Sequence, residues 1–311
     1  MARDAGITTI DTGYGERPRF CAAYLVEHAG RAAFIDCGSN DSVPRLLAAL
    51  EARGLAREAV DWLVLTHVHL DHAGGAGTLM RELPNARLVV HPRGARHMID
   101  PSKLAAGAAA VYGEAEFARH YGTLLPVPAS RVVEAPDGHV VDLAGRPLLC
   151  ADTPGHARHH IAVWDATSRS WFSGDIFGLA YPELATAQGA FVVPTTSPVQ
   201  FDPDEMRASV RRLLAEQPLA VYLTHYGRVD EVARLGADLI EQVDAMVALA
   251  RGCDGGSDRH ARLVDALTAF YVERARRHGV VDAAAVVPRL LALDIELNAQ
   301  GLEVWLDRAR S

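Results

Sequence analysis

The sequence has no hydrophobic run long enough for a transmembrane helix. A helix that crosses a bilayer needs about 20 consecutive, mostly apolar residues, and no such stretch occurs among these 311 residues. The first residues, Met1 to Gly6, carry no apolar segment of the kind that a secretion signal contains. We therefore expect a cytoplasmic protein for which the membrane is not a partner.

Positive charge and cysteine are also scarce. The 31 Lys and Arg residues are outnumbered by 39 Asp and Glu residues, and the formal net charge is -8. Nucleic acids and anionic membrane surfaces select basic proteins, so we expect no nucleic acid as a partner. The four cysteines are scattered without a C-x-x-C pair, which predicts reduced thiols rather than a disulfide framework.

The residues that are abundant are those of an ordinary globular protein. Hydrophobic residues make up 49% of the chain and charged residues 23%, so one large domain can bury its own core. Segments typical of strands, such as residues 20–26, 32–36 and 62–65, alternate with helical segments such as 43–53. This alternation predicts an α/β sandwich of two mixed β-sheets flanked by helices.

The last part of the chain shows no strand pattern. Amphipathic helices are predicted at residues 232–250, 258–278, 283–298 and 302–308. We therefore expect an α/β domain over residues 1–230 and a helical C-terminal extension over residues 231–311 that packs on it. The apolar faces of these helices also suit a homodimer interface. The Ala-rich segment 101–128 is interpreted either as a substrate lid or as a plain insertion.

A cluster of histidines follows the buried strand at residues 62–65. It reads Thr66-His67-Val68-His69-Leu70-Asp71-His72 and is followed by Ala73-Gly74-Gly75. On a regular strand these side chains would alternate between two faces, whereas on a loop they can surround one small volume. Imidazole and carboxylate groups at such spacing are typical of metal sites.

This motif resembles the signature of the metallo-β-lactamase superfamily. Four further segments are similar to motifs of that family and occur in the expected order: Asp152 to His156, Phe172 to Asp175, Leu223 to Gly227, and Phe34 to Gly38, in which Cys37 replaces a threonine. The resemblance covers about residues 8–230. It implies the αββα sandwich of that family, with residues 1–230 as the catalytic domain.

The resemblance also implies a site for two divalent metal ions. The implied ligands are His67, His69 and His156 for one ion, Asp71, His72 and His225 for the other, and Asp175 as a bridge between them. Imidazole and carboxylate ligands suit zinc, with iron or manganese as alternatives. A metal-bridging hydroxide would then be the nucleophile. Asp71 and His72 are also the expected catalytic residues, with Asp71 orienting that hydroxide.

Several residues near the implied ligands have more than one interpretation. His160 matches a histidine that usually supports the site from outside. His159 stands where the family usually has glycine, and it is either a cleft residue or an ordinary surface histidine. Arg158 could bind a substrate carboxylate or phosphate, or be solvated. Tyr181 and Tyr226 could line the cleft and donate to a developing oxyanion, or pack in the core. The loop from residue 194 to 198 is either a rim of the site or a long turn.

The expected reaction is hydrolysis of an ester, thioester or lactone bond of a small molecule. The glyoxalase II-like branch of the superfamily is the most similar, although the C-terminal part carries no glutathione-binding pattern that we recognise. One alternative is a mononuclear iron persulfide dioxygenase that uses His67, His156 and Asp175. Another is a non-enzymatic metal-binding module whose helical extension binds a partner.

Overall fold

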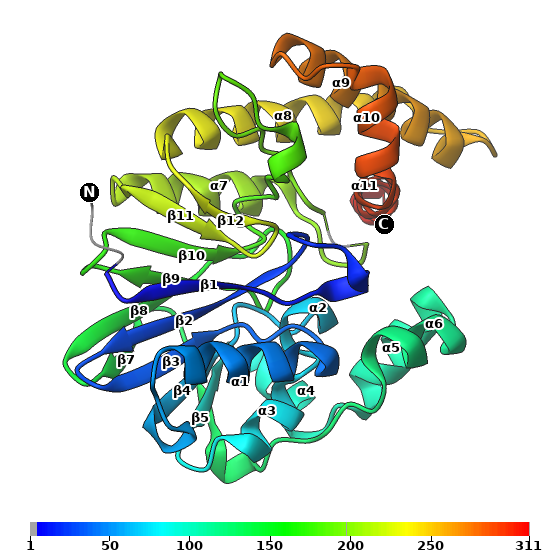
Figure 1. The fold of residues 1–311 in the computed structure, drawn as a ribbon. Helices are drawn as coiled ribbons and strands as arrows, with labels where there is room; N and C mark the ends of the chain where they lie inside the picture. The colour runs from blue at the N-terminus through cyan, green and yellow to red at the C-terminus, as the bar shows by residue number, and fades with distance from the viewer. Residues whose placement is uncertain (1–4, 197, 311) are drawn as a thin grey trace. The chain divides into compact units, whose positions relative to one another are not determined.

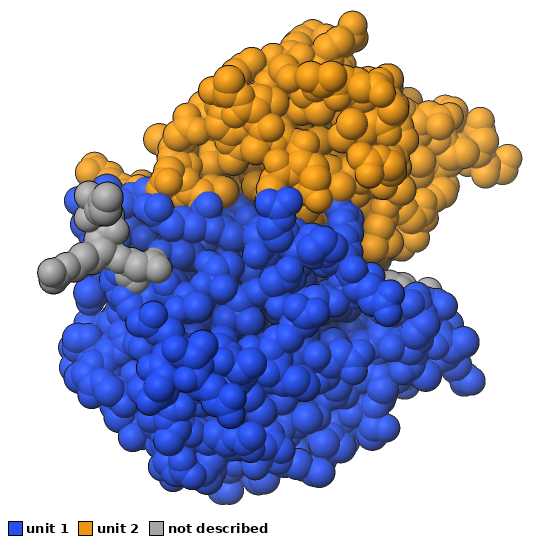
Figure 2. Space-filling view, in the orientation of Figure 1, with its two compact units in different colours: residues 1–152, 159–174, 219–228 blue, residues 153–158, 175–218, 229–311 orange. Residues whose placement is uncertain are grey.

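A computed structural model of the chain describes residues 5–196 and 198–310, apart from the side chains of residues 111 and 112. Internal contacts divide the chain into two compact units, which Figure 2 distinguishes by colour. Unit 1 consists of residues 1–152, 159–174 and 219–228, and unit 2 of residues 153–158, 175–218 and 229–311. The boundary expected at residue 230 stays a prediction, because residues 153–158 and 175–218 share a unit with the C-terminal helices.

Unit 1 contains a first mixed sheet of six strands. In spatial order they are β1 (Ile7–Asp11), β2 (Ala22–His28), β3 (Arg31–Ile35), β4 (Val60–Val64), β5 (Arg87–Val90) and β6 (Val132–Glu134). Strands β1 to β3 pair antiparallel, and β3 to β6 pair parallel. The parallel connections place the ends of β3 and β4 at the same edge of the sheet.

The second sheet also has six strands and is also mixed. Its strands are β7 (His139–Leu143), β8 (Arg146–Asp152), β9 (Ile161–Asp165), β10 (Ser170–Gly174), β11 (Ala220–Leu223) and β12 (Gly227–Val229). Strands β7 to β10 form an antiparallel meander, and β10 pairs parallel with β11. The ends of β10 and β11 therefore lie beside each other.

The core of unit 1 follows from the two-residue period of its strands. In β2, Tyr24 and Val26 belong to the apolar cluster between the sheets, which also contains Phe172 of β10. Ala23 and Leu25 point the other way, into a second cluster with helices. Those helices are α1 (Val43–Ala52), α3 (Ala76–Glu82) and α4 (Pro92–Ile99), and Figure 1 shows them along one face of the first sheet. The helix α2 (Leu70–Ala73) is a single short turn.

Residues 101–128 contain the helices α5 (Ser102–Tyr112) and α6 (Glu114–Tyr121), followed by a non-helical stretch. Helix α6 ends before a segment that contains Pro126 and Pro128. Whether this part of the chain is a lid or an insertion stays open.

Unit 2 contains the remaining helices. They are α7 (Pro203–Ala215), α8 (Val232–Gly252), α9 (Arg259–Arg277), α10 (Ala283–Leu290) and α11 (Ala292–Arg310). The break expected between residues 298 and 302 is wrong, because α11 runs through it. Ile295, Ala299, Leu302 and Leu306 are all buried, so one continuous apolar face carries the helix past Gly301. The break lies at Leu291 instead.

The predicted fold class is confirmed: two mixed six-stranded sheets, flanking helices and a helical C-terminal part. Among the described residues, no helix combines the length and the apolar character that crossing a membrane would require.

Candidate metal centre

The histidine motif lies where strand β4 of unit 1 ends and helix α2 begins. His69 occupies the N-cap position of α2 with an extended backbone, and Asp71 and His72 lie within the single turn of this helix. Two glycines allow this turn to pack closely: a Cβ at Gly74 would lie 2.4 Å from the carbonyl oxygen of Leu70, and one at Gly75 would lie 2.5 Å from that of Ser39. The short helix thus holds Asp71 and His72 close to the residues that precede it.

His67 and His69 form one pair of possible ligands. Nε2 of His67 lies 2.9 Å from Nδ1 of His69. The His67 side chain is completely buried, whereas His69 is half-buried. The pair therefore presents two ring nitrogens at one point, with His69 on the solvent side.

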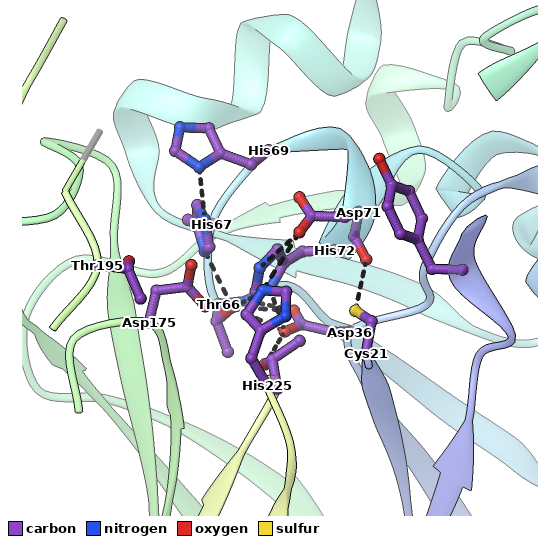
Figure 3. Close-up of polar contacts among 12 residues, drawn as sticks. Cys21, Asp36, Thr66, His67, His69, Asp71, His72, Asp175, Thr195 and His225 are labelled. Carbon is purple, nitrogen blue, oxygen red and sulfur yellow. Dashed lines mark hydrogen bonds and ion pairs between the residues drawn. The ribbon is translucent and has the colours of Figure 1, made fainter. Parts of the chain in front are cut away.

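Asp71, His72 and His225 form a second group. Nε2 of His225 lies 3.2 Å from Oδ2 of Asp71, and Nε2 of His72 lies 3.7 Å from the same oxygen. His225 follows strand β11, so the sheet brings it to a motif that is far away in the sequence. Figure 3 shows the three side chains converging. Two nitrogens and a carboxylate oxygen are donors that suit a divalent ion such as zinc.

The buried carboxylate of Asp36 orients this second group. It accepts hydrogen bonds from the backbone N–H of Thr66 at 2.8 Å and from the hydroxyl of Thr224 at 3.1 Å. Its Oδ2 lies 2.8 Å from Nδ1 of His72. A carboxylate there keeps the proton on Nδ1, which leaves Nε2 as the atom available to a metal.

The backbone orients His225 in the same way. Nδ1 of His225 lies 3.0 Å from the carbonyl oxygen of Phe20 and can only donate to it. Its Nε2 is therefore directed at Asp71, as Nε2 of His72 is. The ring of Phe20 lies edge-on to that of His225, with centroids 5.7 Å apart.

His159 and His160 lie beside His67 in unit 1. His160 is completely buried, and its ring centroid is 5.0 Å from that of His67. His159 is 8% exposed, and its centroid is 6.2 Å from that of His67 and 5.8 Å from that of His69. Neither is an isolated surface histidine; the role expected for each stays a prediction.

The two remaining predicted ligands, His156 and Asp175, belong to unit 2 and contact each other there. Nε2 of His156 lies 3.5 Å from Oδ2 of Asp175, and both side chains are buried. Nδ1 of His156 lies 2.9 Å from the hydroxyl of Thr195. Asn298 of helix α11 holds this loop, since its side chain accepts from the N–H of Thr196 at 2.8 Å and donates to the carbonyl oxygen of residue 194 at 2.9 Å.

The family to which the chain belongs is shown by a sequence-family model that matches most of the chain. A family model for the metallo-beta-lactamase superfamily matches residues 17–225. The chain belongs to the metallo-beta-lactamase superfamily. The matched range includes all seven predicted ligands.

Individual relatives within the superfamily are distant. A metallo-beta-lactamase fold-containing protein of Sulfurisphaera tokodaii is 28% identical over 228 residues, which are 72% of this chain and 79% of that protein. A hydroxyacylglutathione hydrolase of Acidiphilium cryptum is 26% identical over 252 residues, which are 79% of this chain and 83% of that enzyme. The match to the hydroxyacylglutathione hydrolase of Aeromonas hydrophila spans only 41% of that enzyme.

Solved structures of the superfamily share the fold over nearly the whole chain. The crystal structure of an archaeal metallo-beta-lactamase superfamily protein from Sulfolobus tokodaii has a TM-score of 0.67 at 25% identity, and the match covers 96% of this chain and 98% of that one. A family member from Thermus thermophilus has a TM-score of 0.65 at 19% identity, covering 98% and 94%. The likeness therefore extends beyond residue 225 into the C-terminal helices.

The predicted substrate contacts lie in different environments. Arg158 is exposed, and its backbone N–H donates to the side chain of Gln200. Tyr181 is 1% exposed, and its hydroxyl donates to Asp294 of α11 at 3.2 Å. Tyr226 packs against the cluster between the sheets, and burial raises the pKa of its hydroxyl. Contact of these residues with a substrate stays a prediction.

Sequence reasoning did not assign a role to Asp36, Phe20, Cys21 or Thr195. Asp36 was visible as part of a motif, and Thr195 as part of a loop that could form a rim. Phe20 and Cys21 were interpreted only as the start of a strand, because no local pattern marks them. In the structure, the Sγ of Cys21 lies 3.3 Å from the backbone oxygen of Asp71.

Proposed function

We propose that this chain is a metal-dependent hydrolase that binds two divalent metal ions, with zinc the first choice, and cleaves an ester, thioester or lactone bond of a small molecule. The observation that carries the proposal is the convergence of Nε2 of His72 and of His225 on one oxygen of Asp71. Asp36 contacts Nδ1 of His72, and the Phe20 carbonyl oxygen contacts Nδ1 of His225. Such a partner on the ring nitrogen opposite the metal is typical of histidine ligands.

We propose that His156 and Asp175 complete the ligand set with His67, His69 and the group at Asp71. Chain connectivity supports this assignment. Asp175 directly follows Gly174, where a Cβ would lie 2.7 Å from the hydroxyl oxygen of Thr66, and consecutive Cα atoms are about 3.8 Å apart. His156 precedes His159 by three residues, which span about 11 Å at most.

The residues of the site then have distinct tasks. Bound here, two divalent ions would polarise a substrate carbonyl and lower the pKa of a water molecule. Asp71 keeps 24% of its side chain exposed, so solvent reaches it, and we assign it the task of accepting a proton from that water. His159 lies against His67 and His69 without being a ligand, and we assign it to contact with the substrate.

The choice of bond rests on the relatives. Some of them are named hydroxyacylglutathione hydrolases, and an acyl-glutathione is a thioester. The low identity and the short overlap with the Aeromonas enzyme leave the acyl group and the thiol open. Cytoplasmic location and a homodimer stay predictions beside this proposal.

The first experiment is metal content per chain, measured by elemental mass spectrometry on protein purified without chelator. We expect about two equivalents of zinc or manganese, and turnover in a panel of thioesters and lactones. His67→Ala and Asp175→Ala should lose metal and turnover together, while His159→Ala should keep its metal. Full metal and turnover in both ligand variants would refute the site. One iron per chain with oxygen uptake would instead indicate a dioxygenase.

A further inference from the structure

We propose that Cys21 is an additional ligand of the metal ion that Asp71 and His225 bind, so that this position carries a thiolate. The proposal rests on the metal binding proposed above and adds a residue that no motif of the sequence marks. The Sγ of Cys21, a carboxylate oxygen of Asp71 and a ring nitrogen of His225 all lie within 4.8 Å of one another. All three residues belong to unit 1, and Figure 3 shows their side chains.

The separations among these three atoms suit the binding of one shared metal ion. Around a tetrahedral zinc ion, with Zn–S of about 2.3 Å and Zn–N of about 2.0 Å, neighbouring ligand atoms lie roughly 3.5 Å apart. The separations among Cys21, Asp71 and His225 therefore need only a small contraction.

The backbone around Cys21 is fixed on both sides. The carbonyl oxygen of Phe20 holds Nδ1 of His225 at 3.0 Å, and the N–H of Ala22 donates to the carbonyl oxygen of Thr224 at 2.7 Å. The carbonyl oxygen of Cys21 itself accepts from the N–H and the hydroxyl of Thr12. The same segment therefore orients His225 and presents the thiol next to it.

The surroundings of Cys21 differ from those of the other two buried cysteines. Cys150 belongs to the apolar cluster between the sheets, and burial raises its pKa to about 12. Cys37 belongs to the cluster on the other side of the first sheet, and its Sγ donates to the backbone oxygen of His72 rather than facing a side-chain ligand. Cys21 is equally buried, yet its sulfur faces a carboxylate residue and a histidine. A buried thiol that only filled space would suit apolar neighbours better.

A thiolate would change which metal the site prefers. Sulfur is a soft ligand that favours zinc or iron over magnesium, calcium and manganese. As the Sγ–metal bond forms, the thiol proton leaves to solvent, and no oxidant or reductant is needed. The thiolate and Asp71 together would neutralise the charge of a divalent ion, which leaves His225 and His72 as neutral donors. Without a metal, the thiol donates to the backbone oxygen of Asp71.

Cobalt provides the test, because it reports sulfur ligation by its colour. The full chain is freed of metal with a chelator and titrated with Co²⁺ alone. We expect d–d bands in the visible range together with a sulfur-to-cobalt charge-transfer band in the near ultraviolet. Cys21→Ser should lose the charge-transfer band and keep the d–d bands. The matched control Cys150→Ser, a buried cysteine away from the site, should keep both.

The other possible results of the cobalt titration would refute either the sulfur ligation alone or the metal site as well. Visible bands without charge transfer in the unchanged protein, or charge transfer that survives in Cys21→Ser, would refute sulfur ligation and leave the hydrolase proposal standing. No cobalt bands at all would refute both. If Cys21→Ser does not fold, X-ray absorption of the unchanged zinc protein decides: a Zn–S distance of about 2.3 Å supports the proposal, and nitrogen and oxygen neighbours alone would overturn it.

Discussion

Among single residues, Asp36 joins parts of the candidate centre that are far apart in the sequence. It directly follows strand β3 and receives hydrogen bonds from both ends of the histidine motif, Thr66 and His72, and from Thr224. The motif around Asp36 was visible in the sequence, but its partners were not. Thr224 is 188 residues away along the chain, and in the folded chain its carbonyl oxygen accepts a hydrogen bond from the N–H of Ala22 in β2.

Replacing Asp36 with alanine should therefore weaken metal binding without touching a ligand. His72 would lose the acceptor that fixes its proton on Nδ1, so we expect a 10- to 100-fold lower zinc affinity, a typical loss for such a partner, about 1.4–2.7 kcal/mol. Competition with a coloured chelator measures it. Asp61→Asn, which removes an aspartate paired with Arg31 on the surface, is the control. Equal affinities in both variants would contradict this role.

A second residue, Asp165, controls stability rather than chemistry. It is completely buried in an ion pair with Arg146, which is 2% exposed. Burial acts to raise the pKa of Asp165, but the guanidinium of Arg146 and the hydroxyl of Ser168 outweigh it and hold the pKa below the ordinary 3.8. The stabilisation is thus present above the ordinary pKa and is lost as pH falls through the folded value.

Asp165→Asn should lower the free energy of unfolding at neutral pH by about 3–5 kcal/mol, since it leaves Arg146 buried without its counter-charge. The variant should also lose part of the acid dependence of stability. Urea titrations at neutral and acidic pH measure both effects. The double variant Arg146→Met, Asp165→Leu should recover much of the loss. An unchanged acid dependence in Asp165→Asn would show that other carboxyl groups cause it.

At the scale of whole elements, the sequence predicted best what is local. The strand expected at residues 20–26 and the position of the histidine motif after the strand at residues 62–65 needed no knowledge of other segments. The end of a helix depends on what its face packs against, so the continuous buried face of α11 overrode the break expected near Gly301. Cys21 and His225 illustrate the same limit, because the neighbouring Phe20 is 205 residues from His225 along the chain.

Helix α11 also reaches a predicted ligand within unit 2. Asn298, which is 1% exposed, fixes the backbone on both sides of Thr195, and Thr195 contacts Nδ1 of His156. Under the proposed function, this connection would give the C-terminal helices a part in positioning a metal ligand, which their sequence does not indicate.

Asn298→Ala should destabilise the protein by about 1–3 kcal/mol, because it leaves two buried backbone groups without partners. If the loop positions His156, zinc affinity should fall as well, by about tenfold. Chemical unfolding and chelator competition separate the two effects. Asn298→Asp keeps the acceptor for the N–H of Thr196 but places a buried carboxylate against the carbonyl oxygen of residue 194, so it should restore neither property. A loss of stability with unchanged zinc affinity would confine Asn298 to a structural role.

For the molecule as a whole, metal should act as a stabilising ligand. The candidate centre collects buried imidazole and carboxylate groups that compensate one another poorly without a cation. Zinc at 100 times its dissociation constant should therefore add about 2.7 kcal/mol to the free energy of unfolding. Thermal unfolding of the metal-free protein with increasing zinc measures this. Magnesium, which prefers oxygen ligands, should produce no comparable shift, and an equal effect of both ions would indicate non-specific binding.

The division of the chain into units has a consequence for how the protein is made. The backbone passes from one unit to the other after residues 152, 158, 174, 218 and 228, so neither unit is a continuous piece. On the ribosome, β10 emerges well before its parallel partner β11, and the residues between Gly174 and Ala220 take roughly 2–9 s to synthesise. During that interval the edge of β10 is open to wrong partners. His225 appears later still, so the nascent chain cannot complete the proposed ligand set before the residues that follow β11 have been made.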